Sequence, residues 1–248
     1  MFINTDGIVL KSIKYEESDA IVVIFARKLG KISALAKGAR RPKSTLLSGT
    51  QVFSYSNFSI RRNGNMYKLN QCEVKQSFYN LSYNIDTLAH ASYISSLVEQ
   101  NIFENQTNNR LFDLLLKTLY LYSYDDANYQ LITNIFELKL LDYIGYKPSV
   151  LKCTNCGNNN LNKGKFSITE GGMLCNGCID VDKYSIKIDP TTINLIEYIL
   201  KNDIVICNKI RVSKYILNQL DNVLKKYLMT HIENLNLKSL NFLENLKG

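Results

Sequence analysis

The sequence predicts a multidomain α+β protein in which a small five-stranded barrel precedes an all-α helical domain with a cysteine-rich insert. Short β-branched runs fill the first third, helical periodicity fills the rest, and four cysteines lie in two close pairs. With 248 residues, of which 46% are hydrophobic, the chain has room for two or three modules with apolar cores. We expect domains at residues 1–78, 79–149, 150–182 and 183–248.

The first three strands are predicted from short apolar runs. Residues 20–27 form a β-branched run that is typical of a buried strand, and residues 8–13 and 32–36 are its expected neighbours. Between them, residues 28–31 (KLGK) turn the chain.

Two further strands, at residues 52–60 and 66–74, flank an Asn-Gly hairpin turn at residues 62–65 (RNGN). The aromatic side chains change phase along residues 52–60, which predicts a one-residue bulge near Ser56. Five strands with strong curvature in so short a segment predict a closed barrel of the OB-fold class.

Helices are predicted from about residue 78 onward, where apolar side chains recur at three- to four-residue spacing. Pro190 suits the first position of a helix, and His90 is expected to be a packed core residue. The clearest expected helices cover residues 134–143, 190–200, 211–229 and 237–246.

The four paired cysteines have the spacing of a tetrahedral zinc site: Cys153 and Cys156, then Cys175 and Cys178, with eighteen residues between the pairs. Four thiolates fill the coordination sphere and exclude water or substrate, so one structural zinc ion is expected. Gly157 and Gly177 are expected to give the backbone room to turn. The alternative, two disulfides, requires an oxidising compartment.

We expect a cytoplasmic location. The opening MFINTDGIVLKSIKY lacks the pattern of a secretory signal. The longest strongly apolar stretch, at residues 20–26, is far short of the roughly 20 residues that span a bilayer.

Positive charge is concentrated at the start of the chain. Residues 1–80 contain 13 Lys and Arg against 5 Asp and Glu, whereas the remaining 168 residues contain 17 of each. This asymmetry favours a module that binds a polyanion such as nucleic acid. The alternative is a generic solubilising surface.

Residues 37–44 (KGARRPKS) are the strongest candidate for phosphate contact, with Gly38 for close approach and Pro42 to stiffen the turn. Phe53, Tyr55, Phe58 and Tyr67 either stack on bases or fill the barrel core. The predicted DNA-binding residues are Lys37, Arg40, Arg41 and Lys43, extended by Arg61 and Arg62.

No catalytic constellation is convincing, and we expect a protein that is not an enzyme. His231 and Glu233 match the H-x-E of zinc deaminases, but those enzymes keep water on the metal, which four thiolates prevent. Phosphate-binding and dinucleotide-binding glycine motifs are absent, so no small-molecule substrate is expected.

These motifs occur in an order and spacing that resembles the bacterial RecO family of recombination mediators over essentially the whole chain. The matching segments are residues 7–11 (GIVLK), 15–19 (YEESD), 30–34 (GKISA), 37–44, the cysteine pairs and 237–243 (LKSLNFL).

The resemblance implies an OB-fold, a helical domain and a zinc-binding insert. It also implies binding of single- and double-stranded DNA through the basic segment, annealing of complementary strands, and association with the bacterial nucleoid during repair. The implied partners are RecR, the acidic tail of the single-strand-binding protein and, indirectly, RecA, which is loaded at gaps.

Three other functions stay open from the residues alone. One is an OB-fold RNA-binding protein with a structural zinc module. A second is a hydrolase or deaminase that uses a catalytic metal with Glu233. A third is a structural protein whose basic face meets an acidic partner.

Overall fold

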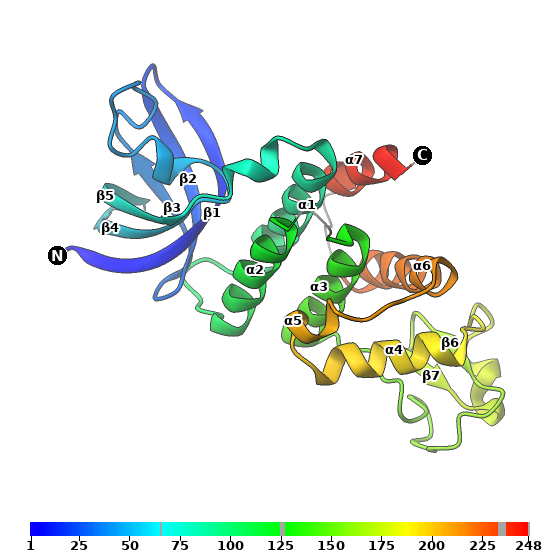
Figure 1. The fold of residues 1–248 in the computed structure, drawn as a ribbon. Helices are drawn as coiled ribbons and strands as arrows, with labels where there is room; N and C mark the ends of the chain where they lie inside the picture. Colours follow the sequence, from blue (N-terminus) through cyan, green and yellow to red (C-terminus); the bar gives the residue numbers. More distant parts are fainter. Residues whose placement is uncertain (65, 125–126, 233–236, 248) are drawn as a thin grey trace. The chain divides into compact units, whose positions relative to one another are not determined.

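The computed structural model describes residues 1–64, 66–124, 127–232 and 237–247, and it divides into two compact units (Figure 1). The first unit comprises Met1–Ala127 together with Asn236–Gly248, and the second comprises Asn128–Leu235. Within the described part of the chain, every helix is too short or too polar to cross a membrane. The finer division into four domains stays a prediction.

Five strands form a closed barrel at the start of the first unit: β1 (Ile3–Tyr15), β2 (Asp19–Ala26), β3 (Gly30–Ala36), β4 (Tyr55–Asn63) and β5 (Met66–Gln76). The strand order is β1-β2-β3-β5-β4, and β4 pairs back to β1 to close the barrel. All neighbours are antiparallel except β3 and β5. The predicted OB-fold barrel is confirmed.

The barrel interior is filled by inward-facing aliphatic and aromatic side chains that alternate along the strands. Each buried side chain of this size stabilises the fold by roughly 1.5–3 kcal/mol relative to exposure. Packing is close at Gly7, where an added Cβ would come within 2.6 Å of Ile24. The larger buried members are Val9, Val22, Ile24, Ile32, Phe58, Ile60 and Leu69.

The fourth strand differs from its predicted bounds of 52–60. It begins at Tyr55, because Phe53 has a φ of 70°, in the left-handed region that strands exclude. The bulge predicted within residues 52–60 is wrong: β4 alternates regularly, and both register shifts along its pairing add a residue to β5, at Lys75 and at Asn70. The aromatic side chains change phase because Phe53 lies before the strand. Gly64 has a φ of 62°, as a primed hairpin turn requires, whereas Asn65 lies outside the described residues.

Three α-helices complete the first unit: α1 (Ile85–Asn101), α2 (Asn109–Tyr122) and α7 (Leu237–Lys247). Helix α1 packs against α2, α7 and β1. His90 lies in α1 with 6% of its surface exposed, which confirms the expected core histidine.

An aromatic and ionic contact fastens α2 to the barrel. Phe112 of α2 meets the ring of Phe25 edge-on at 5.4 Å between centroids. The Arg27 guanidinium lies 4.3 Å from the Phe112 ring centroid and pairs with Asp113 at 2.5 Å. Arg27 therefore contributes to packing. The sequence alone does not distinguish it from the other arginines of the first 80 residues.

The second unit contains four α-helices and a two-stranded sheet. Helix α3 packs against α4, α5 and α6, and Asp189 caps α4 with Pro190 in its first turn, as predicted. The helices are α3 (Tyr129–Tyr143), α4 (Pro190–Lys201), α5 (Ile204–Cys207) and α6 (Lys214–His231), and the strands are β6 (Lys165–Ser167) and β7 (Gly172–Leu174).

Candidate nucleic-acid interface and metal centre

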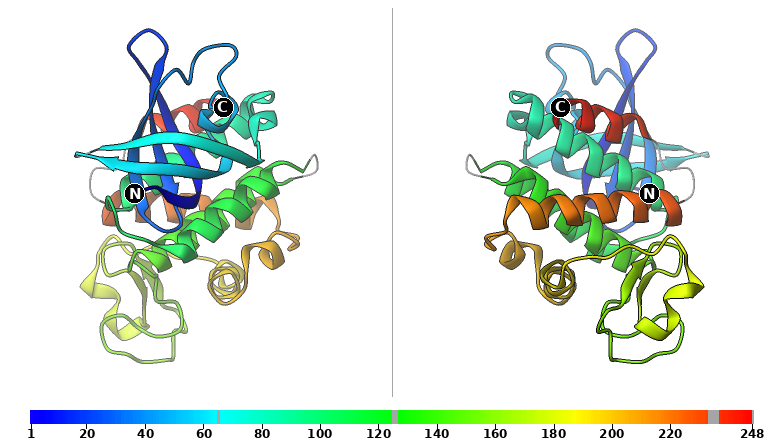
Figure 2. Two further views of the ribbon diagram at one scale, coloured as in Figure 1. Left: turned by 90° about the vertical axis from the view of Figure 1, so that its left-hand side faces the viewer. Right: turned by 90° about the vertical axis from the view of Figure 1, so that its right-hand side faces the viewer.

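The basic loop, residues 37–44, lies between β3 and β4 and is fixed by the turn that joins β1 to β2. The Gly38 N–H donates to Asp19 Oδ1 at 2.7 Å, and the Arg40 N–H donates to the Ser18 carbonyl at 2.9 Å. The Arg40 guanidinium donates to the Glu17 carbonyl at 3.1 Å. Figure 2 shows the β1–β2 turn and the loop projecting from the same end of the barrel.

The loop is built from consecutive tight turns rather than from an open coil. The Arg41 N–H donates to the Gly38 carbonyl at 3.1 Å, and the Ser44 N–H donates to the Arg41 carbonyl at 2.9 Å. Ala39 is fully buried in the barrel core and so anchors the loop to the barrel. Because the backbone is already ordered, a ligand that binds here does not have to order it.

The four loop cations, Lys37, Arg40, Arg41 and Lys43, are all exposed. None of them forms an ion pair with a carboxylate in the described residues, whereas Lys11, Arg27 and Lys75 of the same unit do. The loop therefore presents four adjacent positive charges that no carboxylate of the described residues neutralises.

Arg61 and Arg62 lie on the β4–β5 hairpin and are also exposed. In the strand register, Arg61 of β4 lies opposite Lys68 of β5, and Lys68 lies opposite Leu35 of β3. Two strand spacings, about 10 Å, thus separate Arg61 from the strand that leads into the basic loop. The hairpin extends the basic surface without belonging to the loop.

The four aromatic candidates for base stacking have structural roles. Phe53 and Phe58 are 4% and 0% exposed, which places them in the core. The Tyr55 hydroxyl donates to Asp6 Oδ2 at 3.2 Å, and the Tyr67 hydroxyl donates to Asn105 Oδ1 at 3.0 Å. For Phe53 and Phe58 the core interpretation is the correct one.

Sequence reasoning missed the anchors of the loop. Ser18 and Asp19 belong to a motif that the resemblance includes, but no role could be assigned to them from their spacing. The signal in the sequence was a carboxylate at the start of a strand that is predicted to be buried. Asp19 is the first residue of β2 and is only 8% exposed. A buried carboxylate requires hydrogen-bond donors, and Gly38 supplies one.

The four paired cysteines converge on one point in the second unit. Their Sγ atoms all lie within 4.8 Å of one another, and Cys156 Sγ is 3.6 Å from Cys175 Sγ. A tetrahedral site with metal–sulfur bonds of about 2.3 Å has sulfur–sulfur edges of about 3.8 Å, whereas a disulfide bond is about 2.05 Å long. The geometry therefore fits a metal ion, and the disulfide alternative is wrong.

Hydrogen bonds within the cluster act on individual cysteines. Burial raises the pKa of the Cys153 thiol, but backbone hydrogen bonds from Cys156, Cys175 and Asn155 lower it further, to about 6. The thiolate of Cys153, which is the ligand form, is thus favoured at neutral pH. At Cys156 a backbone hydrogen bond lowers the pKa of the thiol, but hydrogen bonds with the neighbouring sulfurs outweigh it and raise that pKa to about 12. The Asn155 side chain donates to Cys178 Sγ at 3.3 Å and orients that sulfur.

The two knuckles differ in how the backbone turns. Gly157 has a φ of 74°, so the first pair uses the freedom of glycine as expected. Gly177 does not adopt a left-handed conformation, because the chain at the second pair turns through the 3₁₀-helix η3 (Asn176–Val181).

Comparison with known proteins gives a family for this arrangement. The family model described as "Recombination protein O N terminal" matches residues 1–78, and "Recombination protein O C terminal" matches residues 82–241. The chain belongs to the RecO family of DNA repair proteins. The first match covers the barrel with its basic loop, and the second includes the cysteine centre.

Curated relatives named DNA repair protein RecO align over nearly the whole chain. The protein of Alkaliphilus metalliredigens is 45% identical over 240 residues, covering 97% of this chain and 98% of the relative. The protein of Acetivibrio thermocellus is 37% identical over 245 residues, covering 99% and 97%. RecO of Symbiobacterium thermophilum is 31% identical over 248 residues, covering 99% and 98%.

His231 does not join the metal centre of this RecO-family chain. Its Nε2 lies 2.7 Å from the Ile168 carbonyl, and its ring packs 4.2 Å from that of Tyr227. Glu233, the second residue of the deaminase-like motif, lies outside the described residues.

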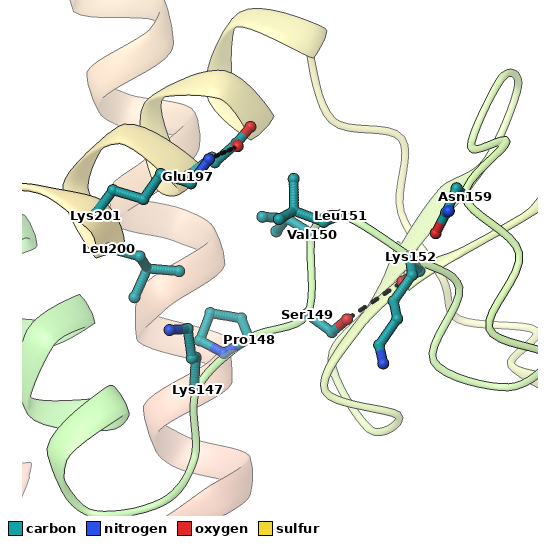
Figure 3. Close-up of a pocket in the computed structure, with 10 residues that line it drawn as sticks. All are labelled: Lys147, Pro148, Ser149, Val150, Leu151, Lys152, Asn159, Glu197, Leu200 and Lys201. Carbon is teal, nitrogen blue, oxygen red and sulfur yellow. Dashed lines mark hydrogen bonds and ion pairs between the residues drawn. The ribbon is translucent and has the colours of Figure 1, made fainter.

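A pocket of about 350 Å³ lies between α4 and the segment that leads from α3 to the cysteines (Figure 3). Pro148, Val150 and Leu200 supply apolar walls, and Lys147, Lys152 and Lys201 stand around them. Lys147 pairs with Asp142, and Lys201 pairs with Glu197, so Lys152 is the rim lysine without an ion pair in the described residues.

Proposed function

We propose that this protein is a mediator of DNA repair and homologous recombination that binds single- and double-stranded DNA without catalysing a covalent step. The observation that carries the proposal is the prefolded loop with four exposed, unpaired cations: Lys37, Arg40, Arg41 and Lys43. Arg61 and Arg62 extend the basic surface along the neighbouring hairpin.

Annealing follows from charge neutralisation. Two complementary strands repel each other through their phosphates, and binding to lysine and arginine releases the counterions that each strand carries. Arginine can hold a phosphate through two N–H groups, while lysine acts as a point charge. Neither contact reads sequence, which suits a protein that must act at any gap.

We propose that the cysteine centre holds one structural zinc ion. Four thiolates at tetrahedral spacing match the ligand set of structural zinc sites and leave no position for a reacting water. The bound metal would hold residues 153–178 together, and the chain's own contribution is the arrangement of thiolates and N–H donors around it.

The proposed partners are RecR, the single-strand-binding protein and, through them, RecA, in the cytoplasm at the nucleoid. For the acidic tail of the single-strand-binding protein we propose the apolar pocket of Figure 3, where Lys152 forms no ion pair in the described residues. Lys152→Glu should abolish binding of a fluorescent tail peptide, while Lys183→Glu, away from the pocket, should leave it intact. If the two variants bind the tail peptide equally well, the tail does not bind in this pocket.

Annealing of complementary oligonucleotides tests the function. The Lys37/Arg40/Arg41/Lys43→Ala variant should lose annealing, with nucleotide and added metal left out of the assay. The matched control is Lys183/Lys187/Lys209/Lys226→Ala, which removes the same charge from exposed positions of the second unit and should anneal normally.

Other outcomes would favour other functions. A wild type that does not anneal, or a loop variant that anneals as well as wild type, would contradict the proposal. Tighter binding of single-stranded RNA than of DNA at equal salt would favour the RNA-binding alternative. Binding to an acidic protein that exceeds binding to DNA would favour the structural alternative.

A further inference from the structure

A groove of about 470 Å³ lies beside the basic loop in the first unit. Its walls come from the far end of β1, the basic loop, the residues that follow η1 (Ser48–Thr50), and the stretch from η2 (Tyr79–Ser82) into α1. Its volume falls in the range of about 300–1,000 Å³ that is typical of small-ligand sites. Of the residues that line this groove, only Arg40 has a role in the proposed function.

The lining is apolar with two positive charges. Leu47, Val52 and Leu88 supply aliphatic surface, Lys14 and Arg40 carry the charge, and no carboxylate lines the groove. Lys14 is exposed and forms no ion pair among residues 1–64, 66–124, 127–232 and 237–247. A ligand that complements this lining has an apolar group and anionic groups next to it.

An exposed aromatic ring stands at the helical side of the groove. Tyr79 is 48% exposed, and its ring meets that of Tyr83 edge-on at 5.6 Å between centroids. The Tyr79 N–H donates to Ser77 Oγ at 3.4 Å, and the Tyr79 carbonyl accepts from Ser82 Oγ at 2.6 Å. A tyrosine on a fixed backbone offers a stacking face at low entropic cost.

The groove is also lined by the backbone outlier Phe53. Its φ of 70° is rare for a residue with a side chain. Two hydrogen bonds hold it there, from the Phe53 N–H to the Val9 carbonyl at 2.9 Å and from the Val9 N–H to the Ser54 carbonyl at 3.0 Å. Such outliers concentrate at functional sites.

We propose that this groove receives an unpaired base of a single DNA strand whose adjoining phosphates lie on Lys14 and Arg40. The proposal rests on the proposed function, because Arg40 belongs to the DNA-binding loop. Tyr79 supplies the stacking face, and the Gln51 side chain supplies one donor and one acceptor for the base edge. A base in a duplex cannot enter, so the groove favours single strands.

The test compares Tyr79→Ala with Tyr79→Phe on three probes at one salt concentration. The probes are an oligodeoxythymidylate, an abasic oligomer with the same number of phosphates, and a duplex. Tyr79→Ala should weaken oligodeoxythymidylate binding by about 5- to 100-fold, as loss of a base-stacking ring does. Binding of the abasic oligomer and the duplex should change by less than about 2-fold, and Tyr79→Phe should retain the wild-type preference.

Unchanged oligodeoxythymidylate affinity in Tyr79→Ala, or an equal loss on all three probes, would overturn the base pocket. If Tyr79→Ala melts below wild type, Tyr79→Leu, which keeps apolar volume without an aromatic face, replaces it under the same criteria. Failure of the proposed function has a different signature, namely a Lys37/Arg40/Arg41/Lys43→Ala variant that binds oligodeoxythymidylate as wild type does.

Discussion

The barrel and the cysteine module (residues 150–182) are both small, but different forces hold them together. The barrel surrounds a continuous cluster of buried side chains that includes Ile24, Phe58 and Ile60. The apolar cluster at the cysteines contains Leu174 as its one buried aliphatic side chain, beside Cys153 and Cys175. Val150, Phe166 and Met173 of the module are also buried, but they lie outside that cluster. Because so little apolar side chain packs at the cysteines themselves, we expect a bound metal to contribute much of the stability of this site.

The same contrast separates the charges. The barrel unit leaves its loop cations without ion pairs in the described residues, whereas the three lysines of the cysteine module are matched in number by Glu170, Asp180 and Asp182. We propose that the packed core of the barrel leaves its surface free to carry charge for a ligand, and that metal binding stabilises the fold of the other unit. Perturbing one unit should therefore leave the other unit's property intact.

The largest expected effect follows the loss of a metal ligand. Cys156→Ser should release the metal, which contributes on the order of 10 kcal/mol in structural zinc sites. Amide hydrogen exchange should then increase throughout residues 150–182 while the barrel and its DNA affinity stay unchanged. Cys72→Ser, outside the cluster, is the control and should retain the metal. If Cys156→Ser keeps its full metal content, the cysteine module is not held together by metal in the way that we expect.

A cavity in the barrel should give the reciprocal result. Phe58 is fully buried, so Phe58→Ala should lower the free energy of unfolding of the barrel by about 3–5 kcal/mol. Metal content should not change. Phe103→Ala removes a ring that is 74% exposed and should cost less than about 0.5 kcal/mol in the same urea titration. If metal is lost along with barrel stability, the two units are not independent.

A smaller effect is expected at the anchor of the basic loop. Asp19→Ala removes the acceptor for the Gly38 N–H, whereas Asp19→Asn keeps an acceptor oxygen. Both variants remove the same charge, so the hydrogen bond alone distinguishes them. Loss of about 1 kcal/mol in loop order should make Asp19→Ala bind single-stranded DNA about 5-fold more weakly than Asp19→Asn. Equal affinities would show that the loop does not need this anchor.

The smallest effect concerns acid stability of the barrel. Burial raises the pKa of Asp6, but hydrogen bonds from Lys75, Asn57 and Tyr55 outweigh it and hold that pKa below its usual 3.8. A lowered pKa adds stability above pH 3.8 that is lost as pH falls through the folded-state value. Asp6→Asn should cost about 1 kcal/mol in urea unfolding at pH 7, and this cost should shrink as the pH falls below 3.8. A pH-independent difference would exclude this ionic contribution.

Much of this architecture could be predicted because local sequence dictates it. Apolar runs and the Asn-Gly turn predicted all five strands, although β4 begins three residues later than expected. Cysteine spacing alone predicted the cluster that could hold a metal. The start of α3 could have been read five residues earlier than predicted, since the Asn128 side chain caps it by accepting from the Leu131 N–H at 3.0 Å.

Other features depend on contacts between distant residues. The aromatic ring of Phe53 favours a strand, but the Val9 hydrogen bonds hold its backbone in the left-handed region. Arg27 and Arg40 look alike in the sequence, and only the position of α2 shows that Arg27 packs on Phe112 while Arg40 stays exposed. The Asp19 anchor likewise joins residues nineteen positions apart.

The salt dependence of single-stranded DNA binding tests the central claim most directly. Each phosphate neutralised contributes about 0.7 to the slope of log affinity against log salt concentration. The Lys37/Arg40/Arg41/Lys43→Ala variant should therefore have a slope smaller in magnitude by about 3, whereas the matched Lys183/Lys187/Lys209/Lys226→Ala variant should keep the wild-type slope. A loop variant with the wild-type slope would contradict the account, because the phosphates would then be bound elsewhere.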